Sequence, residues 1–145
     1  MRNEIIYSTL LLAGLLLVIK GPAFFKKDLG ADIKNTMETD IEKLNQPVVK
    51  KAIIALQAAD SKTWFSLFTE DALLYDDGSS RNFKSFFEKA IGQERFLSID
   101  KVQDNGLSLY GKFHSDVWGE FKTYFKFQIN RDGRITRLDI GQAKY

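Results

Sequence analysis

The chain has 145 residues, a net charge of +2 and 44% hydrophobic residues, which suits one folded domain of ordinary composition. It holds no cysteine and one histidine, His114, so disulfides, thiolate metal sites and zinc sites with several histidine ligands are excluded. The basic residues are scattered without a Lys/Arg cluster, so we expect no nucleic acid partner. We also expect no metal and no cofactor.

The first 25 residues are typical of an export segment. Arg2 precedes an apolar run at residues 5–19, which Lys20 ends. The run has the length of the apolar region of a signal peptide and is short for a membrane span. Residues 1–25 are therefore predicted to be either a cleaved signal peptide or an uncleaved membrane anchor. Either one predicts an exported protein, periplasmic, extracellular or membrane-anchored, that contacts the membrane through this segment alone.

Residues 26–46 are polar and of mixed charge. We expect them to form a tether, which either holds the domain away from the membrane or packs on it as a lead-in helix. The folded domain then comprises residues 47–145.

Three helices are predicted at the start of this domain. Each has a residue that favours a helix start and an apolar stripe with three- and four-residue spacing. The starting residues are Pro47, then Asp60 or Ser61, then Asn82. The stripes are formed by Val49, Ile53 and Leu56, by Trp64, Leu67 and Phe68, and by Phe83, Phe86, Phe87, Ala90 and Ile91.

The rest of the chain has the two-residue period of strands. A short strand is predicted at residues 72–75 and a loop at 76–80, between the second and third helices. Longer strands are predicted at residues 96–102, 107–113, 118–129 and 135–140. No second sheet is predicted, so the helices must cover one face of this one. The predicted fold class is α+β, with three N-terminal helices packed in the concave face of a curved, mostly antiparallel sheet that forms a cone.

The order of these elements resembles the nuclear-transport-factor-2-like superfamily, in particular its SnoaL-like branch. The resemblance covers roughly residues 48–142. It is carried by Ala58-Ala59-Asp60, Trp64, Leu67-Phe68, Thr69-Glu70-Asp71-Ala72, Tyr75-Asp76-Asp77-Gly78, the helix from Phe83 and Asp132-Gly133-Arg134-Ile135. This fold hosts isomerases, cyclases, dehydratases and binding domains, so the resemblance implies a fold more than a function.

The resemblance implies a catalytic candidate at Asp76. Ketosteroid isomerases and SnoaL-like cyclases place an acid/base carboxylate in the mouth of the cone, and Asp76 is the matching position. The oxyanion donors of the isomerases have no match, because Ala52 and Phe125 stand about where a tyrosine and a protonated aspartic acid would be. We therefore expect no steroid isomerase activity.

His114 is the second catalytic candidate, because histidine titrates near neutral pH. It follows Phe113 at a strand end. If it points inward, it forms an acid/base pair with Asp76; if it points outward, it is an ordinary loop histidine. Asp76 has the same two readings, as a pocket base or as a solvated turn residue near Gly78.

Large aromatic side chains are the candidates for lining a ligand cavity, although they serve equally well as core. The candidates are Trp64, Phe68, Tyr75, Phe87, Trp118 and Phe125. Trp118 and Tyr124 have a further reading, as part of a dimer surface on the outer face of the sheet.

The function predicted from these observations is that of an exported SnoaL-like domain. It would bind a small, partly apolar ligand or a partner, and it would form a homodimer. The alternative is a SnoaL-like enzyme of the isomerase, cyclase or dehydratase type, which uses Asp76 or His114 for proton transfer. A purely structural interaction module is the third reading, favoured if phenylalanine side chains fill the cone.

Overall fold

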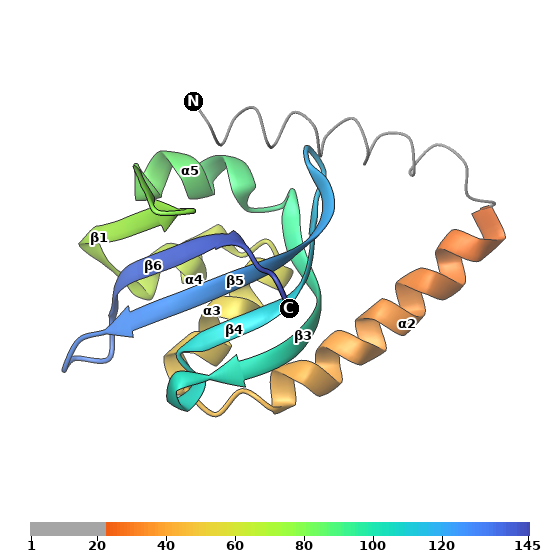
Figure 1. The fold of residues 1–145 in the computed structure, drawn as a ribbon, viewed down its shortest axis with the longest axis horizontal. Coiled ribbons are helices and arrows are strands. Elements are labelled where there is room, and N and C mark those ends of the chain that lie inside the picture. Colours follow the sequence, from red (N-terminus) through yellow and green to blue (C-terminus); the bar gives the residue numbers. More distant parts are fainter. Residues whose placement is uncertain (1–22) are drawn as a thin grey trace.

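The structure, a computed structural model, describes residues 23–145, with side chains from Gly30 onward. Its centre is a six-stranded sheet with the strand order β2-β1-β6-β5-β4-β3 (Figure 1). Neighbouring strands run antiparallel except β1 and β6, which are parallel. The strands are β1 (Phe68–Asp76), β2 (Ser79–Arg81), β3 (Glu94–Gln103), β4 (Ser108–Ser115), β5 (Gly119–Ile129) and β6 (Ile135–Gln142).

Three helices cover the concave face of the sheet, as predicted. They are α3 (Pro47–Gln57), α4 (Ser61–Ser66) and α5 (Phe83–Ala90). Their starts follow the sequence signals: Pro47 lies in the first turn of α3, Asp60 Oδ1 accepts the Thr63 N–H at 3.1 Å, and Asn82 Oδ1 accepts the Ser85 N–H at 2.9 Å.

The boundary between α4 and β1 differs from the prediction. The segment Thr69-Glu70-Asp71 continues β1, where the sequence pattern predicts a helix end. Phe68 begins this strand and pairs with Ile135 of β6. The Phe68 side chain is nevertheless buried, as predicted. The start of β1 lies under α4, so Phe68 faces the same core that the apolar side of α4 faces.

A long helix, α2 (Ala23–Glu42), spans the last residues of the predicted export segment and most of the predicted tether, which follows the lead-in alternative. Its C-terminal part packs on β3, while its other end extends away from the domain (Figure 1). Met37 and, just after the helix, Leu44 are buried, and Asp40, 6% exposed, accepts the Ile99 N–H at 2.7 Å. A buried carboxylate that accepts a backbone N–H from β3 ties α2 to the sheet.

The predicted export segment, residues 1–25, lies outside the described residues up to residue 22, and this part includes the whole apolar run at 5–19. Within residues 23–145, no helix combines the length and the apolar character that crossing a bilayer requires.

Side chains along the strands alternate between the core and the outer face of the sheet. On β5 the residues Thr123, Phe125 and Phe127 are buried, and the residues between them face outward. Part of the core is a group of touching rings, here called the aromatic cluster: Trp64, Phe68, Phe83 and Phe87, with ring centroids 4.4–5.3 Å apart.

Candidate functional site

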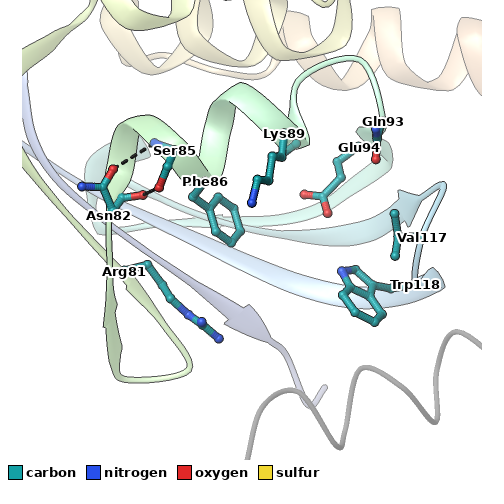
Figure 2. Close-up of a pocket in the computed structure, with 10 residues that line it drawn as sticks. Arg81, Asn82, Ser85, Phe86, Lys89, Gln93, Glu94, Val117 and Trp118 are labelled. Atoms are coloured by element: carbon teal, nitrogen blue, oxygen red, sulfur yellow. Dashed lines mark hydrogen bonds between the residues drawn. The ribbon is translucent and has the colours of Figure 1, made fainter. Parts of the chain in front are cut away.

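The core does not fill the whole concave side of the sheet. A pocket of about 560 Å³, here called the mouth, lies between α5 and the turn that joins β4 to β5 (Figure 2). A smaller space of about 50 Å³, the inner cavity, lies deeper against β1, β5 and β6. Phe86, Glu94 and Trp118 line both spaces, so the two spaces lie next to each other.

Asp76 lies in the wall of the inner cavity. It is the last residue of β1 and alternates with buried Leu74, so its side chain faces the core and is only 2% exposed. The chain then turns sharply, with positive φ at Asp77 and Gly78, and returns as β2. This hairpin brings Arg81 Nη2 to 3.8 Å from Asp76 Oδ2. The pocket reading of Asp76 therefore fits the structure, and the solvated-turn reading does not.

Glu94 is a second carboxyl group in the same cavity, and sequence reasoning missed it. It is the first residue of β3, pairs with Ser115 and lies on the same face as buried Phe96. Burial is the main reason that its pKa rises to about 7, and the charges of Asp76 and Asp116 add to the rise, while a hydrogen bond with Ser115 opposes it. Glu94 is thus able to hold or release a proton near neutral pH.

Aromatic side chains form the rest of the wall. Phe86 and Trp118 separate the mouth from the inner cavity, and Phe113, Phe121 and Phe125 line the cavity beneath them. Ser115 Oγ accepts the N–H groups of Val117 and Trp118 at 3.2 and 3.1 Å, which holds the turn that carries Trp118. Two carboxyl groups therefore lie beside an aromatic surface, the usual composition of a small-molecule site.

His114 does not join this site. It pairs with Arg95 of β3 and Glu120 of β5 on the outer face of the sheet, opposite to inward-facing Phe113. Its Nε2 lies 2.8 Å from Asp116 Oδ1. The inward reading of His114 is thus wrong, since a residue next to inward-facing Phe113 on a regular strand must face outward.

The six predicted lining residues divide into three groups. Trp118 and Phe125 line the pocket. Trp64, Phe68 and Phe87 are buried in the aromatic cluster instead. Tyr75 lies on the outer face, where its ring centroid is 4.1 Å from the Arg137 guanidinium carbon. Aromatic residue type thus does not by itself separate the lining of the pocket from the core.

Phe86 is a further lining residue that was assigned to the core. The helical stripe includes both Phe86 and Phe87, but Phe86 is half-buried in the pocket wall and Phe87 is fully buried. Among residues 23–145, no group of three His, Asp or Glu side chains is close enough to hold a metal ion.

Comparison with solved structures identifies the fold. A nuclear-transport-factor-2-like protein of unknown function from Cytophaga hutchinsonii matches with a TM-score of 0.56 at 15% identity, over 66% of this chain and 87% of that one. A putative polyketide cyclase from Sinorhizobium meliloti matches with a TM-score of 0.53 at 20% identity, over 65% of this chain and 93% of that one. The chain therefore shares its fold with these nuclear-transport-factor-2-like and cyclase-like structures.

A structure with a bound ligand is also similar. The Orange Carotenoid Protein of Anabaena, solved with bound canthaxanthin, matches with a TM-score of 0.50 at 21% identity, over 66% of this chain and 35% of that one. No protein-family model matches the chain.

One curated protein is similar in sequence. The cysteine–tRNA ligase of Methanococcus maripaludis is 29% identical over 126 residues, which covers 72% of this chain and 26% of the ligase. The chain therefore spans about a quarter of that enzyme's length.

Proposed function

We propose that the domain binds a small, partly apolar molecule in the mouth, with a polar group of that molecule directed at Asp76 and Glu94. The observation that carries this proposal is the arrangement of the site, in which a surface pocket and a deeper space walled by buried Asp76 share Phe86, Glu94 and Trp118. Carotenoid binding by a protein of the same fold is in line with a ligand that is largely apolar.

The volumes set the size of each part of the ligand. The inner cavity, at about 50 Å³, holds little more than one or two water-sized groups, whereas the mouth, at about 560 Å³, holds a small organic molecule. The body of the ligand therefore rests in the mouth, and a donor group such as a hydroxyl or an N–H points toward the inner cavity. A hydrogen bond from such a donor to a carboxyl group in an aromatic wall is stronger than in water, because the local dielectric is low.

The test compares two neighbouring carboxylates in the full chain. Phenylnaphthylamine, an uncharged apolar dye with one N–H donor, is expected to fluoresce on binding. Asp76→Asn should change its affinity by about tenfold, which is the effect of altering one hydrogen bond to a charged group. Asp77→Asn is the matched control, because Asp77 Oδ1 accepts the Gln142 N–H at 3.1 Å and an asparagine oxygen keeps that bond.

Trp118→Ala should remove most of the dye binding. Dye that binds equally well to the wild-type chain and to Trp118→Ala would place the dye elsewhere and contradict the proposed site.

A second candidate function is proton transfer, favoured by the two carboxyl groups that share the inner cavity. Asp76, paired with Arg81, would act as the base. Glu94, whose pKa of about 7 leaves much of it protonated, would donate a hydrogen bond to a developing enolate oxygen. Glu94 would thus replace the oxyanion donors of the isomerases, which have no match at Ala52 and Phe125. Of these two residues, Phe125 lines the inner cavity.

Exchange of the α-protons of α-tetralone in deuterated buffer tests this second function, with the rate followed by NMR. The wild-type chain should exceed the buffer rate, and Asp76→Asn should lose most of that excess. Glu94→Gln, which keeps a neutral donor, should retain part of it. A wild-type rate equal to the buffer rate leaves binding as the function of the site.

The proposal includes export through residues 1–25, for which the apolar run at residues 5–19 is the support. Fusing residues 1–46 to a reporter that is active only outside the cytoplasm tests it. An inactive, cytoplasmic fusion would contradict export.

The proposal also includes a homodimer through the outer face of the sheet. Tyr110 and Tyr124 pair across β4 and β5 on that face, with Lys126 Nζ within 6.0 Å of both ring centroids. Trp118, which the dimer reading included, lines the pocket instead. Sedimentation of the protein at micromolar concentration should give a dimer mass, and Tyr124→Glu should shift it to a monomer; a wild-type monomer contradicts the dimer.

A further inference from the structure

We infer that the mouth selects an amphipathic anion, whose charged group lies on Arg81 and Lys89 and whose apolar part lies against Phe86 and Trp118. This inference rests on the proposed binding function and names the class of ligand. Carboxylates are the simplest members of that class, and sulfonates and phosphates present similar oxygens.

Arg81 is the first observation. Its Nε is buried and has no hydrogen-bond partner among the described residues. Its Nη2 lies 3.8 Å from Asp76 Oδ2, which is an ion-pair distance and too long for a hydrogen bond. A guanidinium carries five N–H donors in a fixed plane, and an unsatisfied buried donor is costly. The Arg81 side chain lines the mouth and is 32% exposed, so the exposed part of its guanidinium is available to the oxygens of an anion.

Lys89 supplies a second positive charge. It is exposed in the last turn of α5, and its side chain extends into the mouth on the side of Phe86 nearer Glu94 (Figure 2). Arg81, which precedes α5, approaches from the other side of the same ring. Within the part of the chain that the structure describes, neither cation forms an ion pair other than the 3.8 Å pair of Arg81 with Asp76. The two charges therefore flank an aromatic surface.

The apolar half of the mouth comes from Phe86, Val117 and Trp118. Val117 is 38% exposed and lies next to Trp118 in the lining of the mouth. A molecule with a flat apolar body and one anionic group covers this surface and reaches the cations together. A neutral apolar molecule covers the surface and leaves the cations in water.

The acidic groups around the mouth decide the pH at which an anion is accepted. Glu94 faces Asp76 of β1, Asp116 beyond β4, and the cations Lys89 of α5 and Arg81 of β2. Because the pKa of Glu94 is raised to about 7, its negative charge is largely absent below that pH. Repulsion of an anionic ligand by Glu94 therefore weakens as the pH falls, and the mouth becomes more positive.

The experiment uses two dyes that differ by one charged group. Anilinonaphthalene sulfonate carries a sulfonate, and phenylnaphthylamine is the same ring system without it. The full chain should bind the sulfonate dye about tenfold more tightly than the uncharged dye, since a charge-assisted contact has an effect of this size. Arg81→Gln and Lys89→Gln should each lose most of this preference. Lys89→Gln should also leave the affinity for the uncharged dye within about twofold.

Two matched controls separate local charge from net charge. Lys84→Gln removes an exposed lysine of α5 that does not line the mouth, and Arg131→Gln removes an exposed arginine of the β5–β6 turn. Both should keep the preference for the sulfonate dye. If the controls lose the preference for the sulfonate dye as much as Arg81→Gln and Lys89→Gln do, binding depends on net charge alone and the inference is overturned.

Lys89→Gln is also the control for folding. Lys89 is exposed and outside the core, so its replacement should leave the fold intact, whereas Arg81 pairs with buried Asp76.

The pH dependence of binding is a second test. The sulfonate dye should bind more tightly at pH 6 than at pH 8, and Glu94→Gln should abolish this difference. A chain that binds the uncharged dye at the mouth with no preference for the sulfonate overturns the inference and keeps the proposed function. A chain whose Trp118→Ala variant binds both dyes unchanged overturns both.

Discussion

Phe86 and Phe87 are neighbours on α5, yet they belong to two regions with opposite properties. Phe87 lies in the aromatic cluster, where it touches Trp64 and Phe83 at ring-centroid distances of 4.7 and 5.3 Å. Phe86 lies in the wall of the mouth beside Glu94 and Trp118. The first region is filled by rings, and the second leaves space beside charged groups. Phenylalanine side chains therefore form both the core and the pocket wall. The two regions differ in their neighbours, which are other rings in the core and charged groups in the pocket.

Replacing the two phenylalanines is the sharpest test of this difference. Phe87→Ala should reduce the free energy of unfolding by about 3–5 kcal/mol, because it leaves a cavity among packed rings. Phe86→Ala should cost only about 1–2 kcal/mol, because the ring is half-buried and solvent reaches the space it leaves. Urea denaturation of the two variants measures both values.

The binding data complete this comparison. Phe86→Ala should weaken the binding of phenylnaphthylamine although the chain stays folded. Equal losses of stability for the two variants would mean that the mouth is as tightly packed as the aromatic cluster.

Glu94 gives the next largest effect, and its sign depends on pH. Its pKa is raised in the folded chain from an ordinary value of 4.5 to about 7, so folding is most favoured when Glu94 is protonated, below pH 4.5. That stability is lost as the pH rises from about 4.5 to 7, because the unfolded chain ionises first. Glu94→Gln should therefore be more stable than the wild-type chain at pH 8, by on the order of 2 kcal/mol.

The same two proteins should have similar stabilities at pH 4, where Glu94 is uncharged in both states. Thermal unfolding at the two pH values measures the difference. A variant less stable than wild type at pH 8 would show that the ionised carboxylate is well compensated in the pocket.

The smallest effect concerns Asn82, which joins the two regions by starting α5. Asn82→Ala removes the side-chain acceptor for the Ser85 N–H and should cost about 1 kcal/mol. Asn82→Asp, which keeps an acceptor at that position, should cost less than half as much. Chemical denaturation resolves the two, and equal costs would mean that the cap contributes nothing.

The sequence predicts the covering helices and the long strands well, because their apolar spacing is regular. Residues 83–91 and 118–129 show this most clearly. It predicts α2 poorly, since this helix is polar along most of its length and gains stability from contacts with β3 that sequence spacing does not reveal.

The site is predicted in part for a similar reason. Asp76 follows from the resemblance, and alternation with Leu74 supports its inward direction. Glu94 was reachable by extending the alternation of buried Phe96 back by two residues, but the preceding Gly92-Gln93 gives no strand signal. Arg81 lies in a three-residue strand that pairs only with β1, and no local pattern indicates so short an element.

The contact between α2 and β3 has a consequence for the solubility of the chain. β3 is the last strand in the order of the sheet, so one of its edges has no neighbouring strand within the described residues. Open strand edges recruit other chains and promote aggregation. Asp40 accepts a hydrogen bond from the Ile99 N–H of β3, and Met37 of the same helix is buried. A chain shortened to start at Pro47 would lose this cover, so we expect it to precipitate or to form edge-to-edge oligomers where the full chain does not.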